Sequence, residues 1–172
     1  MSSGWTDMVA VIARHNVHAN EILFREASRL DRQILEGTSS PSRESIYQLL
    51  VHLLAVEMNY LSQITGGNRV LSDEDRSSML TLSAGAEAHR ARLLTFVSSL
   101  TDAELMRETP FRFSTGATLR YTVWQILTQI FLHSAQHRGE LSILLSELGH
   151  PLPIDDIIVR FSDASGQAWP FR

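Results

Sequence analysis

The stretch Gln129-Ile-Phe-Leu-His133-Ser-Ala-Gln-His137-Arg138-Gly139-Glu140 places two histidines four residues apart in a segment with helical periodicity. On a helix, side chains at this spacing leave the same face, with their Cβ atoms about 5–6 Å apart. Two imidazoles placed in this way can bind one metal ion from a single turn. A catalytic zinc-type site usually takes three protein ligands and keeps one position open. The stretch therefore predicts a helix and directs attention to a third ligand.

The composition is that of one globular domain. The chain has 172 residues, of which 44% are apolar and 20% are charged, so it can bury a core of ordinary size. Its formal charge is −4 and it has no cluster of lysines and arginines, which argues against a nucleic-acid-binding surface. It contains no cysteine, so a metal ion would have to be held by His, Asp or Glu side chains.

Neither a membrane-spanning helix nor a secretion signal is expected. No apolar run approaches the roughly 20 residues that a membrane-spanning helix needs. The first seven residues, Met-Ser-Ser-Gly-Trp-Thr-Asp, lack the basic and apolar regions of a signal peptide. We therefore expect a cytoplasmic protein that has neither membranes nor nucleic acids among its partners.

Four long helices are predicted from apolar residues that recur at spacings of three and four. The expected helices cover about residues 6–35, 42–64, 72–100 and 121–148. The expected N-caps are Thr6, Ser42 and Ser72, and the expected stops are Gly37, Gly66 and Gly149. Four such helices in one small domain, residues 1–172, predict an all-α four-helix bundle.

Two further segments complete the predicted domain. Between residues 108 and 119, Phe111 and Phe113 alternate with Arg112, and Gly116 marks a turn, so a short hairpin-like insertion is expected before the last helix. The tail, residues 154–172, is too apolar for a disordered segment. We expect it to pack on the bundle or on a partner.

His52 is the best candidate for the third ligand. It lies in the middle of the second predicted helix, among the apolar residues Leu49, Leu50, Leu53 and Leu54. An imidazole in such surroundings needs a hydrogen-bonding partner or access to water. Facing helices of a bundle can build a metal site, so His52 is predicted to join His133 and His137. Neutral imidazoles suit Zn, Ni, Cu or Fe.

A structural role for these histidines is the alternative, because a pair of histidines at this spacing is more often a surface or core feature than a ligand pair. The other histidines carry no such pattern: His15 and His18 are expected to be partly exposed, and His89, beside Arg90, is expected to be solvated.

Motifs of other enzyme classes are absent from the sequence. It lacks the metalloprotease motif His-Glu-x-x-His, the Gly-x-Ser-x-Gly elbow, the Gly-x-Gly-x-x-Gly fingerprint and the P-loop.

Three motifs resemble the DinB-like family, the DinB/YfiT-type metalloenzyme superfamily. The block His133-x-x-x-His137-Arg138-Gly139-Glu140 is similar to the family's common form His-x-x-x-His-Arg-Gly-Gln. The segment Ile46-x-x-Leu-Leu-x-His52-Leu-Leu-Ala-x-Glu57 looks like the family's first-ligand helix. The segment His15-Asn16-x-x-Ala19-Asn20-x-x-Leu23 matches near the start of the first helix. The resemblance covers nearly the whole chain in order.

The resemblance implies a four-helix bundle with a long crossover connection, usually a homodimer, and a three-histidine site for a divalent metal. By position, the implied ligands are His52, His133 and His137. Zn or Ni is the first expectation for the ion, with Fe or Mn as alternatives. Arg138 is expected to bind a carboxylate of a cofactor or substrate. Glu140, which replaces the usual glutamine, could orient a ligand histidine.

The resemblance also limits what is expected of function. Relatives include transferases and isomerases that use low-molecular-weight thiols, so we expect a metal-dependent enzyme of the thiol S-transferase, isomerase or hydrolase type. The alternatives are a non-catalytic, metal-binding or stress-associated homodimeric bundle, and an interaction module with incidental histidines. His18 stands where the family often has Trp, so it could alter a pocket wall or reach the site. No catalytic residue is identified.

Overall fold

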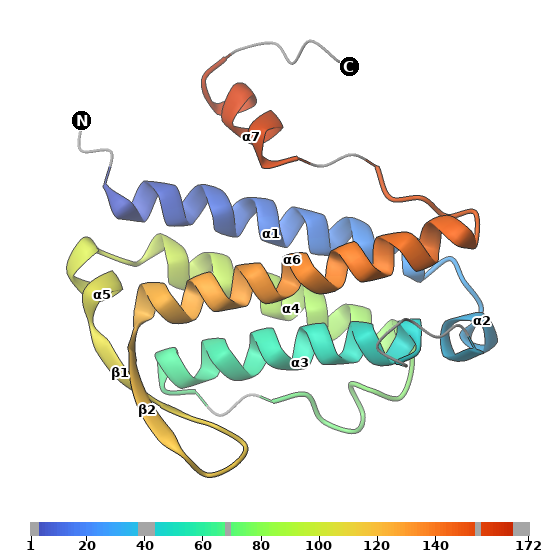
Figure 1. Cartoon of the computed structure of the whole chain (residues 1–172), viewed down its shortest axis with the longest axis horizontal. Coiled ribbons are helices and arrows are strands. Elements are labelled where there is room, and N and C mark those ends of the chain that lie inside the picture. Colours follow the sequence, from blue (N-terminus) through green and yellow to red (C-terminus); the bar gives the residue numbers. More distant parts are fainter. Residues whose placement is uncertain (1–3, 38–43, 68–69, 154–155, 167–172) are drawn as a thin grey trace.

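The computed structural model describes residues 4–37, 44–67, 70–153 and 156–166 (Figure 1). The chain is mostly helical, as predicted. The four long helices are α1 (Trp5–Ala27), α3 (Ile46–Thr65), α4 (Met79–Ser98) and α6 (Val123–Glu147). The three short helices of the described residues are α2 (Arg32–Gly37), α5 (Asp102–Met106) and α7 (Ile157–Ala164).

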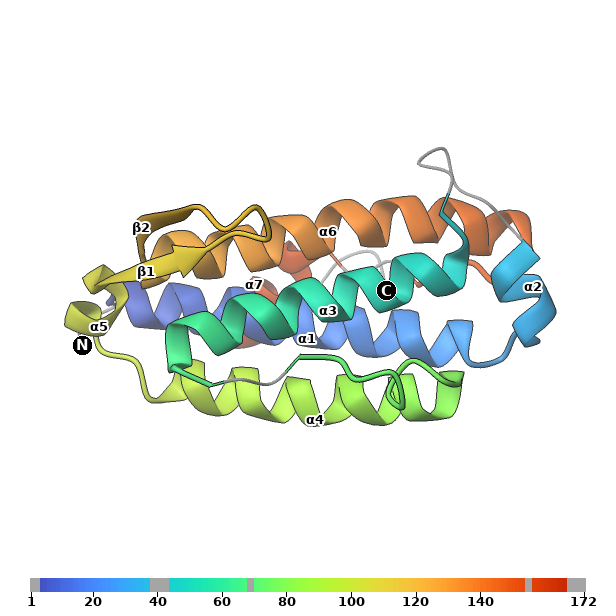
Figure 2. The same ribbon diagram turned by 90° about the horizontal axis from the view of Figure 1, so that it is seen from below.

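The four long helices lie side by side (Figures 1 and 2). Helix α1 packs against α4 and α6, and α3 packs against α6 and α4. Residues 70–78, which precede α4, run back along α3, and α3 and α4 point in the same direction (Figure 2). The core between the helices is built mainly from leucines, and α3 contributes the fully buried Leu49, Leu50 and Leu53. This packing fixes which faces of α3 and α6 meet.

The first predicted helix is interrupted, so the expectation of one helix over residues 6–35 is wrong. Helix α1 ends at Ala27, where the Ser28 hydroxyl donates to the Phe24 carbonyl at 2.7 Å. A serine that bonds back to the preceding turn competes with the helical backbone and bends the chain. Helix α2 then begins after Asp31, whose carbonyl accepts from the Leu35 amide at 3.1 Å. The N-cap of α1 is Gly4 and not the predicted Thr6.

The other helix starts also shift. Helix α3 begins after Ser45, which forms a capping box with Gln48; the predicted cap, Ser42, lies outside the described residues. Helix α4 begins after Ser78, so the predicted start at Ser72 is wrong. The Ser72 hydroxyl accepts from the Asp75 amide at 3.1 Å and closes a separate turn. The predicted stop of the second helix is confirmed, because Gly66 ends α3 with a φ of 71°.

The predicted hairpin is present. Strand β1 (Glu108–Arg112) pairs antiparallel with β2 (Thr118–Thr122), with Phe111 opposite Leu119. The turn contains Gly116, whose φ of 88° suits glycine. Helix α6 follows directly after Thr122, whose backbone amide donates to Oε1 of Gln125 at 2.9 Å. The hairpin therefore lies next to the first turns of the helix that carries His133 and His137.

The tail contains a helix that sequence periodicity did not predict. Helix α7 packs against α1, so the described part of the tail lies on the helical body. The remaining residues of the predicted tail segment, 154–155 and 167–172, lie outside the described residues. None of the helices in the described ranges is long and apolar enough to cross a membrane.

Candidate functional site

The three histidines singled out by the sequence meet between α3 and α6. His52 comes from α3, and His133 and His137 come from successive turns of α6. The Nε2 atoms of His52 and His133 are 3.2 Å apart. One candidate ligand atom from each of the three rings lies within 4.8 Å of the other two. The residues that sequence spacing and resemblance grouped together are therefore neighbours in space.

Local packing explains why these rings converge. His52 is partly buried beside the fully buried Leu49 and Leu53, on the side of α3 that meets α6. His133 and His137, four residues apart, leave one face of α6 and contact each other with ring centroids 4.5 Å apart. The His52 ring lies 5.1 Å from the His133 ring and 4.9 Å from the His137 ring. The packing of two leucine-rich helices thus fixes all three imidazoles.

The electrostatics of the cluster favour an uncharged His133 ring. Burial, together with the neighbouring His137 and His52, lowers the pKa of His133 from 6.5 to about 4. His133 is therefore neutral at pH 7, and a neutral imidazole has the free lone pair that a metal ligand needs. The buried Nδ1 of His133 also has no hydrogen-bond partner among the described residues. Three converging imidazole nitrogens fit a divalent transition-metal ion.

Glu140 lies beside the cluster on α6. Its Oε2 atom is 3.4 Å from Nδ1 of His137, one turn earlier. A carboxylate at one ring nitrogen typically fixes the orientation of a ligand histidine and leaves the other nitrogen for a metal. The contact agrees with the role that the sequence suggested for Glu140, and the role itself stays a prediction.

Arg138 and His18 lie outside the cluster. The Arg138 Nη1 atom donates to Oδ1 of Asn16 at 2.7 Å and to Oδ1 of Asn20 at 2.8 Å. These bonds tie the guanidinium to α1, and its predicted contact with a cofactor carboxylate stays a prediction. The metal-ligating group formed by the described side chains comprises only His52, His133 and His137, and it leaves out His18.

A buried polar network, centred on Glu57, lies behind the cluster, and sequence reasoning did not predict it. Glu57 is only 2% exposed, and its Oε1 atom accepts from Nδ2 of Asn16 at 2.8 Å and from Nδ2 of Asn20 at 2.9 Å. The Ser134 hydroxyl donates to the same oxygen. The network thus joins α1, α3 and α6 through one carboxylate.

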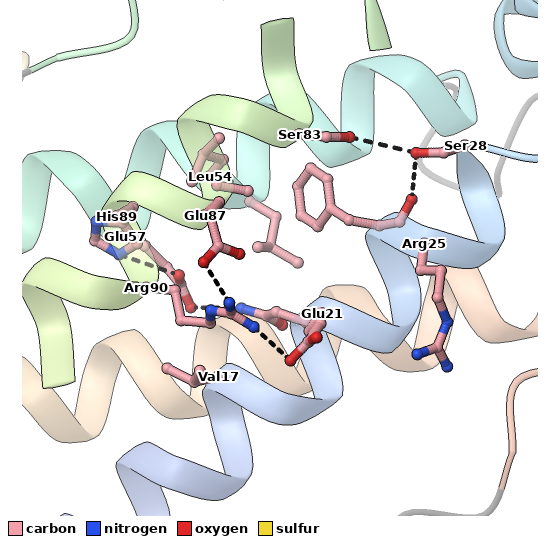
Figure 3. A pocket seen from close by; sticks show the side chains of 14 residues that line it. Val17, Glu21, Arg25, Ser28, Leu54, Glu57, Ser83, Glu87, His89 and Arg90 are labelled. Carbon is pink, nitrogen blue, oxygen red and sulfur yellow. Dashed lines mark hydrogen bonds and ion pairs between the residues drawn. The ribbon is translucent and has the colours of Figure 1, made fainter. Parts of the chain in front are cut away.

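His89 brings α4, the remaining long helix, into this network. Its Nε2 atom lies 3.2 Å from Oε2 of Glu57 (Figure 3). The expectation that His89 is solvated is wrong, because it is only 4% exposed. The side chain turns inward toward Glu57, whereas the adjacent Arg90 turns toward Glu21 and Glu87 in a cavity of about 200 Å³ (Figure 3).

Glu57 is held in its ionised form. Burial alone raises the pKa of this carboxyl group, but His89, Ser134 and Asn16 together outweigh burial, and the pKa lies below its ordinary value of 4.5. Ser134 directly follows the candidate ligand His133 in the sequence. The network therefore holds α6 from within the helical core, next to the turn that presents His133 to α3.

Comparisons with known proteins agree with this architecture. The model of the DinB family matches residues 1–165. A search of curated protein sequences found no match. Among solved structures, a DinB-like protein, YjoA, from Bacillus subtilis is similar, with a TM-score of 0.61 and 20% sequence identity. The match covers 84% of this chain and 96% of that chain. At this identity the likeness establishes a shared, mostly helical fold.

Proposed function

The chain belongs to the DinB family, and from this premise we propose that it binds one divalent metal ion through His52, His133 and His137. The observation that carries the proposal is the convergence of three imidazole nitrogens within 4.8 Å of one another. Three imidazole nitrogen donors leave at least one coordination position for a water molecule or a substrate. Zn and Ni are the proposed ions, with Fe or Mn as alternatives.

We also propose that the four long helices form the four-helix bundle with a long crossover that the resemblance implies. The support is the side-by-side packing of α1, α3, α4 and α6 and the shared direction of α3 and α4 (Figure 2). In such bundles, metal sites are built from side chains on facing helices. The position of the histidines on α3 and α6 follows this pattern.

The proposed reaction class is thiol transfer or isomerisation, or hydrolysis. A divalent ion held by the three histidines would lower the pKa of a thiol or water in its open position and so would supply a nucleophile at neutral pH. The chain's own residues hold the site: Glu140 orients His137, and the Glu57 network fixes α6 from the inner side. A metal-retaining protein without activity toward a panel of thiols and electrophiles would favour the non-catalytic alternative.

A homodimer is proposed through the outer face of α6. Trp124, Leu132 and Ile143 are exposed by 42%, 64% and 63%, and their spacing places them within one side of the helix. Gly139 lies on the same side, and a Cβ atom there would meet nothing within 4 Å among the described residues. An exposed apolar face of this kind is typical of a protein–protein interface.

The metal proposal is tested by competition titration of Zn²⁺ and Ni²⁺ against a chromophoric chelator. The wild-type chain is expected to bind one ion, because the cluster provides three donors in one place. His52→Ala removes the only donor from α3 and should weaken binding by more than the roughly 10–100-fold typical of losing an outer-shell partner. His18→Ala is the matched control and should bind like the wild type. Unchanged affinity in His52→Ala would refute the proposed ligand set.

A further inference from the structure

A cluster of aromatic side chains lies where the β1–β2 hairpin meets α3. Tyr60 of α3 contacts Phe111 of β1 with ring centroids 4.6 Å apart and an interplanar angle of 74°. Phe111 in turn contacts Phe113 at 5.1 Å and Tyr121 at 6.1 Å. These edge-to-face contacts are the arrangement that aromatic rings prefer. Phe111 is only 3% exposed and anchors the hairpin, whereas Tyr60, Phe113 and Tyr121 keep part of their surface open.

The open surfaces of these rings line a cavity of about 410 Å³, which lies within the size range of small-molecule sites. The rest of its lining comes from α6, namely Gln125, Ile126 and Gln129. None of the seven described residues that line the cavity is charged at neutral pH. Its chemistry therefore suits a neutral, flat, largely apolar group and disfavours an ion, whose burial without a partner is costly.

Two amides give the cavity a polar edge. The Oε1 atom of Gln125 accepts from the backbone amide of Thr122 at 2.9 Å as part of the α6 cap. This bond orients the Gln125 carboxamide and leaves its NH₂ group as a donor for a carbonyl or hydroxyl substituent. Gln129 is exposed and offers both a donor and an acceptor.

The cavity lies next to the three-histidine cluster along α6. Gln129 precedes His133 by one turn, which is about 6 Å along the helix axis. Tyr60 follows His52 by eight residues, or about 12 Å along α3. The cavity and the histidines therefore occupy neighbouring stretches of the same α3–α6 contact. A molecule with one end at the histidines could place a ring in the cavity.

We propose that this cavity is a substrate subsite that binds a planar aromatic group of a small molecule whose reactive end reaches the three-histidine site. The inference rests on the proposed function and adds a substrate class to it. Phe113, Tyr60 and Tyr121 contact the ring, and the Gln125 and Gln129 amides contact a polar substituent on it. The hairpin, which precedes the metal-binding helix in the chain, thus acts as the specificity element.

Two hydroxamates with the same metal-chelating head test the subsite. Acetohydroxamate carries a methyl group, and benzohydroxamate carries a phenyl ring in its place. On the full-length, Zn²⁺-loaded chain, benzohydroxamate is expected to bind about tenfold more tightly or better, because burial of a ring is favourable. Phe113→Ala should remove most of this advantage and leave the affinity for acetohydroxamate unchanged. Leu119→Ala, at a 53% exposed position on the same hairpin, is the matched control and should retain it.

The outcomes distinguish a failure of the subsite proposal from a failure of the metal-site proposal. Equal affinity for both hydroxamates in the wild-type chain would overturn the subsite and leave metal binding intact. If Phe113→Ala still bound benzohydroxamate more tightly than acetohydroxamate by the wild-type ratio, the subsite would also be overturned. If neither hydroxamate binds and the chain retains no Zn²⁺, the proposed function fails and the subsite fails with it. If Phe113→Ala does not fold, Gln129→Trp provides the same test, because it fills the cavity from an exposed position.

Discussion

Replacing Glu57 with alanine is expected to lower the free energy of unfolding by about 3–5 kcal/mol, because it breaks a buried hydrogen-bond network. The substitution removes the acceptor of three buried or part-buried donors, the side chains of Asn16, Asn20 and Ser134. Each donor left without a partner costs about 1–3 kcal/mol. It also removes the carboxylate that faces His89. Urea denaturation with linear extrapolation measures the change.

Glu87→Ala is the matched control for this prediction. Glu87 is also a glutamate of a long helix, but its side chain is 62% exposed and pairs with Arg90 at the surface. Exposed ion pairs of this kind usually contribute about 0–1 kcal/mol. If Glu57→Ala cost no more than Glu87→Ala, the buried network would not contribute to stability as its geometry indicates.

The same carboxylate makes stability depend on pH. The pKa of Glu57 in the folded chain lies below its ordinary value of 4.5, so the unfolded chain binds the proton more readily. Its contribution is therefore fully present above pH 4.5 and is lost as the pH falls through the lower folded value. In the Glu57→Gln variant, the side chain at this position has no group that titrates. On acidification below pH 4.5, this variant should lose less stability than the wild type does.

A divalent metal ion is expected to stabilise the wild-type chain and to have no such effect on His133→Ala. An ion that binds only the folded state at 100 times its dissociation constant adds about 2.7 kcal/mol. His133 is the ligand at which the effect should be largest, because its Nε2 atom faces that of His52 and its ring contacts that of His137. Thermal unfolding with added Zn²⁺ or Ni²⁺, compared with unfolding in a chelator, measures the difference.

His150→Ala is the control for this second prediction. His150 follows the end of α6 and lies outside the metal-ligating group of the described residues. The variant should gain the same stability from metal as the wild type does. Equal stabilisation of His133→Ala and wild type would mean that the ion binds elsewhere on the chain.

Sequence periodicity predicted the helical fold because apolar residues recur at spacings of three and four along the long helices. The hairpin was predictable from the alternation of Phe111 with Arg112 and from Gly116, whose backbone has a positive φ. The break after Ala27 was not predictable, because the apolar spacing continues across it through Leu30 and Ile34. Helix starts shifted for a related reason: Ser72 and Ser78 are both suitable caps, and local sequence does not rank them.

The candidate site was partly predictable. The spacing of His133 and His137 placed two rings on one helical face without any structural information. His52 was predicted as the third ligand from its position among leucines, and the family resemblance strengthened that prediction. Its placement beside the other two rings depends on the packing of α3 against α6, which periodicity does not provide. The Glu57 network was missed because polar residues beside an apolar stripe look like surface residues. Only the packing of α1 and α4 turns His89 inward toward that carboxylate.

The central claim is that His52, His133 and His137 form a metal site, and metal analysis of a tag-free preparation tests it most directly. Elemental analysis of the purified wild-type chain is predicted to find about one divalent ion per chain. His133→Ala, purified in parallel, is predicted to contain far less, because it lacks one of the three converging donors. A wild-type chain that retains no ion, even after incubation with Zn²⁺ and Ni²⁺, would contradict the claim.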